Sequence, residues 1–275
     1  MIRTAVVERE VLARREVVRR SLLSRQRLLQ LCFVLVVLVG WQLLGDHEGD
    51  LFLAPPTSVF KAAVDIVPTS AFWSTLGQTA KGILFGFAIA AVLGVLIGIL
   101  MGTYRGVATA LNPIVSAGYV IPEAALVPLL IVWFGLDQKP RVIAVVLFAI
   151  FEIIVTTYTG VRNADAMLND VVRSFGANSR QLFLKVTLPG ALPFIFAGLR
   201  IGAARAVKGM VVAELLFAAT GIGGAIQLSA NAFQTDRVMF YVVVVTVIGV
   251  SFSGVVQLVE RLWMRRWHES YRQQA

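Results

Sequence analysis

Ionisable side chains stand inside long apolar segments of this sequence, and they are its clearest candidates for chemistry. Glu123, Glu152, Arg205 and Lys208 lie near the middle of such segments, and Arg200 and Glu214 lie in them as well. A charge at membrane depth is costly unless it is paired or hydrated. Two interpretations follow: structural ion pairs between the glutamates and Arg205 or Lys208, or a polar solute pathway formed by these four residues with Pro122 and Pro128.

No catalytic or cofactor motif accompanies these charges. The sequence has no G-x-x-x-x-G-K-[ST], H-E-x-x-H, G-x-S-x-G or C-x-x-C pattern. One cysteine, Cys32, excludes an intrachain disulfide, and two histidines are too few for a histidine metal cluster. We therefore expect no enzyme activity, cofactor or metal in this chain.

The composition is that of a polytopic all-α membrane protein. Of the 275 residues, 57% are hydrophobic and only 15% are charged, and the mean hydropathy is +0.78. Six apolar segments are long enough to be membrane spans: 28–44, 75–102, 107–134, 141–161, 191–218 and 238–258. The third contains Pro113, Pro122 and Pro128, and broken backbone at membrane depth must be buried in protein or line a wet cavity. This pattern favours a helix that lines a pathway.

Two further patterns predict how helices pack. In the second span, small residues recur at every fourth position, which lets a neighbouring helix approach closely: Gly82, Gly86, Ala90, Gly94, Gly98 and Gly102. Ahead of that span, Pro55 and Pro56 predict the start of a short amphipathic helix. Its expected inward face is Val59, Phe60, Ala63, Val64 and Val67.

Between the fourth and fifth spans, the sequence predicts two short amphipathic helices hinged at Gly176. Apolar residues of the first recur at i, i+3, i+4 and i+7: Leu168, Val171, Val172 and Phe175. Ser179 is expected to cap the second helix, which carries Leu182, Phe183 and Val186 and is expected to stop at Pro189. Such an exposed apolar stripe needs a partner surface.

The run from Asp170 through Gly176 to Val186-Thr-Leu-Pro189 resembles the EAA loop of the membrane subunits of bacterial ABC importers. Other runs, such as Val127-Pro-Leu-Leu-Ile-Val-Trp-Phe-Gly135, resemble the nitrate/sulfonate/taurine branch. Asp170 replaces the usual Glu, Val171 and Val172 replace two alanines, and Glu123 and Glu152 stand where that family has proline.

The resemblance implies a type I importer permease fold that works as a dimer. It implies an ABC ATPase partner that holds ATP and Mg²⁺, and a periplasmic or lipid-anchored binding protein that delivers a sulfonate, nitrate or other small organic anion. The residues that it assigns to ATPase docking are Asp170, Val171, Val172, Phe175, Gly176, Leu182, Phe183, Val186, Leu188 and Pro189. A self-sufficient proton-coupled transporter or channel that uses Glu123 and Glu152 stays open as the alternative, and a membrane enzyme is disfavoured.

The net charge of +9 reflects membrane topology rather than nucleic-acid binding. Eight arginines precede Leu28, and four more lie from Arg261 onward. The positive-inside rule then places both termini and the Gly176 hinge on the cytoplasmic side of a bacterial inner membrane. The expected organisation begins with a basic segment (1–27), which is either a helix on lipid or a disordered tail, and a first span (28–45). A periplasmic loop with the amphipathic helix (46–74) follows. The permease core (75–260), which includes the coupling loop (162–189), leads to a basic tail (261–275).

Overall fold

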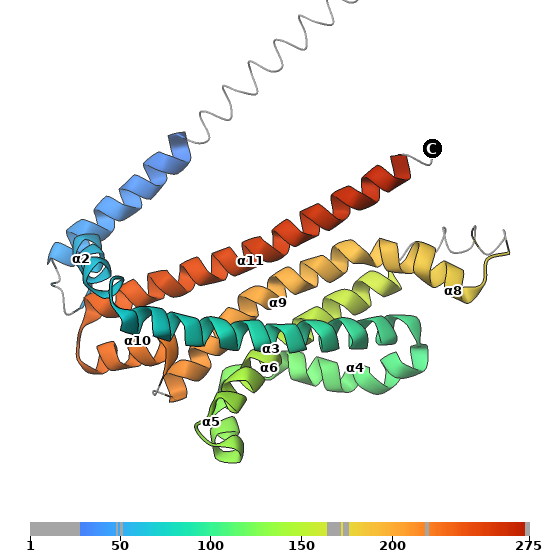
Figure 1. Cartoon of the computed structure of the whole chain (residues 1–275), viewed down its shortest axis with the longest axis horizontal. Coiled ribbons are helices and arrows are strands. Elements are labelled where there is room, and N and C mark those ends of the chain that lie inside the picture. Colours follow the sequence, from blue (N-terminus) through green and yellow to red (C-terminus); the bar gives the residue numbers. More distant parts are fainter. Residues whose placement is uncertain are drawn as a thin grey trace, which may run out of the picture.

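The computed structural model describes residues 28–47, 49, 52–163, 172, 176–217 and 220–272, with side chains described as far as Met264. The described chain consists of helices joined by short turns (Figure 1). After the helix Leu28–His47, the elements are α2 (Pro56–Ile66), α3 (Ser70–Thr103), α4 (Arg105–Val120), α5 (Glu123–Phe134), α6 (Gln138–Arg162), α8 (Ser179–Leu182), a π-helix (Phe183–Thr187), α9 (Leu188–Phe217), α10 (Gly221–Asn231) and α11 (Thr235–Arg272).

Five of these helices are long and apolar enough to cross a membrane, and a bent pair of helices would make a sixth span. The expected third span is this pair rather than one helix, because α4 and α5 meet at an angle of 97°. Only Pro122 breaks the chain: Ile121 before it is extended, at φ −59° and ψ 130°, as the residue before a proline prefers. Pro113 and Pro128 lie inside α4 and α5.

The small-residue stripe of α3 lies directly against α6. A Cβ atom on Gly86 would lie 2.5 Å from Val145 Cβ, and one on Gly98 would lie 2.6 Å from Thr157 Cβ. The predicted close packing is therefore confirmed. Where α9 joins this pair, the three helices share a core of buried residues: Ile83, Ala90, Val145, Ala149, Ile153, Ala206, Val207 and Met210.

The predicted amphipathic helix exists as α2, but its inward face was assigned wrongly in part. Val59, Ala62 and Ile66 are buried, whereas Phe60 and Val64 are 69% and 56% exposed. The buried set follows i, i+3 and i+7 and packs with Phe72 and Phe240 from α3 and α11. Phe60 and Val64 lie four residues apart and so share a different stripe of the helix.

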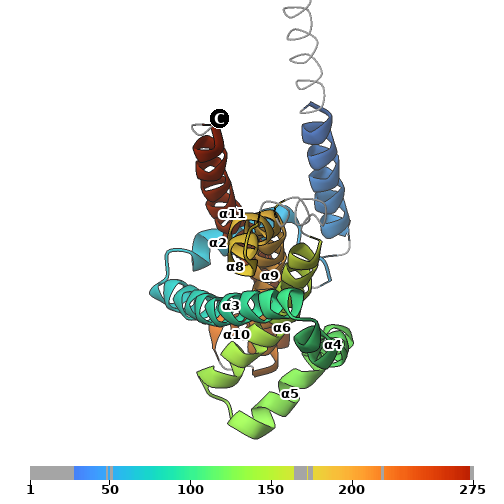
Figure 2. The same ribbon diagram turned by 90° about the vertical axis from the view of Figure 1, so that its right-hand side faces the viewer.

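Two other boundaries differ from the sequence prediction. The stretch from Thr220 to Gly224, which lies outside the six predicted spans, contains the N-cap and first turn of the helix α10. The last span continues as one helix to Arg272 instead of ending near Leu258. The helix Leu28–His47 stands apart from α11 and is mostly exposed (Figure 2), so lipid or another protein must cover its apolar surface. The segment 1–27 lies outside the described residues.

Candidate functional site

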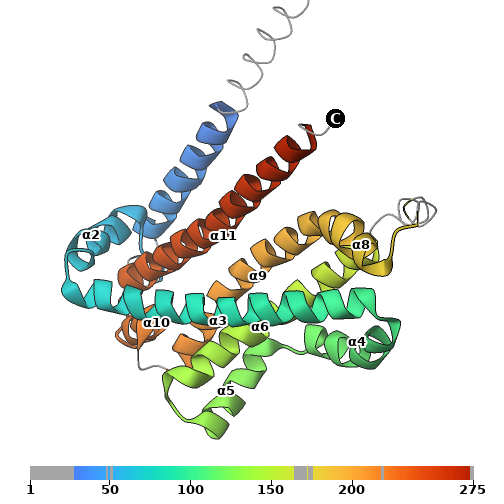
Figure 3. The same ribbon diagram turned by 45° about the vertical axis from the view of Figure 1, so that its right-hand side comes forward.

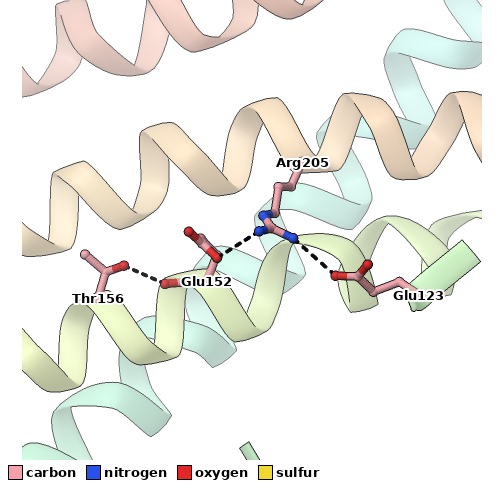
Figure 4. Close-up of polar contacts among 4 residues, drawn as sticks. All are labelled: Glu123, Glu152, Thr156 and Arg205. Carbon is pink, nitrogen blue, oxygen red and sulfur yellow. Dashed lines mark hydrogen bonds and ion pairs between the residues drawn. The ribbon is translucent and has the colours of Figure 1, made fainter. Parts of the chain in front are cut away.

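Arg205 on α9 binds two carboxylates that come from two other helices (Figure 4). Its Nη1 lies 3.3 Å from Glu123 Oε1, and its Nη2 lies 3.4 Å from Glu152 Oε2. The predicted pairing of the glutamates is thus confirmed for Arg205. We call Glu123, Glu152 and Arg205 the charge cluster.

The α4–α5 bend brings Glu123 into this cluster. Pro122 is the N-cap of α5, and Glu123 is its first residue, where the positive end of the helix dipole favours an acid. Glu152 and Arg205 lie midway along α6 and α9. The guanidinium carbon of Arg205 also lies 5.8 Å from the centre of the Tyr119 ring on α4, within cation–π range. Four helices therefore converge on one arginine.

The charge cluster is open to its surroundings and has an excess of negative charge. The side chains of Arg205, Glu123 and Glu152 are 37%, 20% and 14% exposed. Two carboxylates and one guanidinium sum formally to −1. Glu152 Oε2 is buried and accepts no hydrogen bond from the described residues, so it has capacity for one more donor.

Two other residues of the predicted pathway, Lys208 and Pro128, take no part in these ion pairs. Lys208 is exposed and forms no ion pair with any carboxylate of the described chain, so the alternative pairing through Lys208 is wrong here. Lys208 follows Arg205 by three residues in the helix, so the two side chains point in directions about 60° apart. Pro128 is exposed on α5.

A second polar network, buried between α3, α9 and α10, was not predicted from the sequence. The Thr79 hydroxyl donates to Glu214 Oε1 at 2.7 Å, and Glu214 Oε2 accepts from the Gly223 N–H at 2.9 Å. The Ile222 N–H donates to Thr79 Oγ1 at 2.9 Å. A Cβ on Gly221, where φ is +78°, would lie 1.9 Å from Glu214 Oε1, so the glycine leaves room for this carboxylate. The only signals in the sequence were a glutamate inside an apolar segment and the glycines that follow it.

Gly176, the residue of the predicted hinge, has a left-handed backbone conformation with φ +78°. The Ala177 N–H donates to the Val172 carbonyl at 3.3 Å, which is the long bond of a Schellman helix end. Of the first predicted helix, Leu168, Asp170, Val171 and Phe175 lie outside the described residues, and Val172 is partly buried.

The second helix begins and ends differently from the prediction. Asn178, not Ser179, is the N-cap: its side chain accepts from the Gln181 N–H at 2.8 Å, and Gln181 Oε1 accepts from the Asn178 N–H at 3.0 Å. This reciprocal capping box satisfies two backbone donors, which a serine one position later cannot do.

Pro189 does not stop the helix, because α8 continues through the π-helix into α9. The Leu188 N–H donates to the Phe183 carbonyl, five residues back. This wider turn makes room for the proline ring that follows. Leu182 is buried, whereas Phe183, Val186, Leu188 and Pro189 are partly buried. We call residues 162–189 the elbow; its part from Ser179 onward is thus continuous with α9, the helix that carries Arg205.

Comparison with known proteins identifies relatives over most of the chain. Residues 94–265 match the family described as "Binding-protein-dependent transport system inner membrane component". The "Putative aliphatic sulfonates transport permease protein SsuC" of Bacillus subtilis (strain 168) is 30% identical over 238 residues, which cover 86% of each chain. The "Taurine transport system permease protein TauC" of Escherichia coli (strain K12) is 29% identical over 256 residues, 90% of this chain and 92% of that protein.

A solved structure supports the fold. The chain in "Crystal structure of an amino acid ABC transporter with histidines" superposes with a TM-score of 0.61, at 17% identity, over 74% of this chain and 97% of that one. The helical arrangement in Figure 1 is therefore shared with an ABC transporter chain of different sequence.

Proposed function

Because this chain belongs to the inner membrane components of binding-protein-dependent transport systems, we propose that its charge cluster lines the path of the solute. The chain is a transmembrane permease subunit of an ATP-driven importer. This family membership decides against the alternative, a self-sufficient proton-coupled transporter. The observation that carries the proposal is the Arg205 guanidinium, which is shared by two carboxylates and partly exposed within apolar spans. Charged groups at this depth that remain partly exposed mark a hydrated passage.

The solute is a small sulfonate that also carries an amine. Two relatives are named for aliphatic sulfonates and for taurine, and a sulfonate can bind the guanidinium in a bidentate manner. If the sulfonate displaced a carboxylate from Arg205, the charge of that carboxylate would be left without a partner, which costs binding free energy. An ammonium group on the same solute would compensate it, since Glu152 Oε2 accepts no hydrogen bond from the described residues. A zwitterion therefore fits the cluster better than a simple anion.

Coupling to ATP takes place through the elbow. A separate ABC ATPase, which holds ATP and Mg²⁺, binds the elbow surface around Gly176 and the exposed Arg180, Leu184 and Lys185. A second copy of the permease and a binding protein complete the transporter. Since α8, the π-helix and α9 are continuous, a displacement of the elbow moves Arg205 as part of one rigid body.

The test is ATP-dependent uptake of taurine and of ethanesulfonate, which differ in the amino group, by proteoliposomes that contain the ATPase and one binding protein. We expect Arg205→Ala to abolish uptake of both solutes. Glu152→Gln should lower the ratio of taurine to ethanesulfonate uptake several-fold while the binding protein stays the same. Uptake by Arg205→Ala at the wild-type rate would contradict the pathway, and an unchanged ratio in Glu152→Gln would contradict the assignment of the solute.

A further inference from the structure

A pocket of about 970 Å³ lies between the end of α3, the end of α6 and α8. Figures 1 and 3 show these parts together at one end of the helix bundle. Three arginines from three separate segments line it: Arg105 after α3, Arg162 at the end of α6, and Arg180 on α8. We call it the elbow pocket. It is separate from the charge cluster, and none of the residues of the cluster lines it.

The lining of the elbow pocket is basic and incompletely paired. Its described lining residues include no aspartate or glutamate, and no described carboxylate lies within 4.0 Å of any of the three guanidinium groups. Arg162 is held in place by Tyr158, whose hydroxyl lies 2.6 Å from Arg162 Nη1 and whose ring centre lies 5.7 Å from the guanidinium carbon. Thr103, Ser179 and Thr187 add hydroxyl groups. This donor set suits a multiply hydrogen-bonded anion.

The other part of the lining is apolar and lies where membrane spans end. Ile99, Leu100 and Met101 are in the last turns of α3, and Val161 is in the last turn of α6. Leu182 and Phe183 cover the pocket from the elbow side. An apolar surface beside a cluster of arginines at a membrane boundary matches the two halves of a phospholipid, because basic pockets between spans bind anionic headgroups.

We propose that the elbow pocket binds a phosphate ester and that its apolar part selects one carried by a lipid, such as phosphatidylglycerol. The lipid would bridge the ends of α3 and α6 to the elbow. This proposal depends on neither the solute nor the ATPase, so it can be tested on the purified full chain alone.

The experiment is calorimetric titration of the chain in a non-ionic detergent with short-chain phosphatidylglycerol, short-chain phosphatidylcholine or inorganic phosphate. Each of Arg105→Ala, Arg162→Ala and Arg180→Ala should weaken phosphatidylglycerol binding about fivefold, as expected for an exposed charge pair worth about 1 kcal/mol. The control Lys61→Ala removes an exposed cation on α2 and should change nothing. Arg105 and Arg180 are exposed, so these variants should keep the wild-type thermal transition.

The three ligands distinguish the possible sources of the phosphate group. Phosphatidylglycerol binding that is tighter than binding of the other two and sensitive to the arginines supports the proposal. Inorganic phosphate that binds equally tightly, with the same dependence on the arginines, would overturn the lipid assignment in favour of a soluble phosphate. Equal binding of phosphatidylcholine, or arginine variants that bind like the wild type, would overturn the proposal.

Discussion

At the scale of single residues, Arg205 is the one charged group that forms two ion pairs within the described part of the chain. Its planar guanidinium contacts two carboxylates in different directions and also lies near an aromatic ring. A lysine ammonium presents one compact charge and cannot reproduce this fork. Removing Arg205 would leave two acids close together within apolar spans, which is worse than removing all three charges.

We therefore predict that Arg205→Ala lowers the stability of the protein in detergent by about 1–2 kcal/mol, reduced from fully buried values because the cluster is partly exposed. Adding Glu152→Gln to Arg205→Ala should restore part of this loss, since the carboxylates then no longer repel one another. The measurement is thermal unfolding of the single and double variants. Arg200→Ala is the control, because Arg200 forms a single ion pair with the described residues, to Glu260 at 3.7 Å. Strictly additive effects would show that the pairs contribute no coupling.

Thr79 supports a different prediction. Its hydroxyl donates to Glu214 and accepts from the Ile222 N–H, so Thr79→Val leaves buried polar groups without partners. We expect a loss of about 1–3 kcal/mol, seen as a lower unfolding temperature. The matched variant Thr156→Val removes a hydroxyl that donates only to the Glu152 carbonyl one turn back in its own helix, and its effect should be much smaller. Equal effects would show that the Glu214 network does not hold α10 in place.

At the scale of elements, the periodicity of the sequence predicted which helix faces pack together, but the sequence did not predict where helices break. The glycine spacing of α3 specified the face that meets α6, because that face depends only on the sequence of one helix. Three prolines looked equivalent in the third span, yet only Pro122 breaks it. The choice between a kink and a break depends on the packing of neighbouring helices, which one segment does not encode. The π-helix before Pro189 was missed for the same reason.

The residues of the charge cluster were also predicted only in part. Opposite charges at similar depth pointed to ion pairs, but the preference for Arg205 over Lys208 depends on how α9 is rotated against α6. The Thr79–Glu214 contact joins residues 135 positions apart. Nothing in the local sequence of Thr79 indicates that its helix meets the end of α9.

The glycine stripe leads to a prediction with a control on the same helix. Gly86→Ala places a methyl group 2.5 Å from Val145 Cβ, so α3 and α6 must separate, at a cost of about 1–3 kcal/mol. Gly77→Ala adds the same methyl group where nothing lies within 4 Å, and should be neutral or stabilising because alanine favours a helix. Thermal unfolding in one detergent compares the two. A Gly86→Ala protein as stable as Gly77→Ala would show that the helices are not tightly packed at this point.

The hinge of the elbow gives the next prediction. Valine at position 176 would be strained at φ +78°, whereas asparagine tolerates a left-handed conformation. Gly176→Val should therefore reach the membrane normally, because the spans pack elsewhere, but should lose most ATP-driven uptake. Gly176→Asn should retain most of it. Uptake and ATP hydrolysis are measured together in proteoliposomes. Full uptake by the valine variant would show that the hinge does not couple the two activities.

At the scale of the whole molecule, the ends of the helices separate into two groups. The α3–α4 turn, the end of α6 and α8 lie at one end of the bundle, while α2 and α10 lie toward the other (Figures 1 and 3). On the path proposed above, a solute that crosses between the two ends would pass the middle of α6 and α9, where Glu152 and Arg205 lie. The arrangement therefore places the charge cluster between the elbow and the opposite face, as alternating access requires.

The orientation of this arrangement is the last prediction. The sequence has eight arginines before Leu28 and four from Arg261 onward, and the elbow adds Arg162, Arg173, Arg180 and Lys185. Basic segments next to spans remain in the cytoplasm, so the elbow should face inward and α2 outward. In a Cys32→Ser background, Lys61→Cys should react with a membrane-impermeant maleimide on intact spheroplasts. Arg180→Cys should react only after the membrane is permeabilised. Both positions are exposed, so poor access within the fold would not explain a difference between them. The reverse labelling pattern would place the elbow outside, where no ATPase could reach it, and would overturn the coupling role together with the orientation.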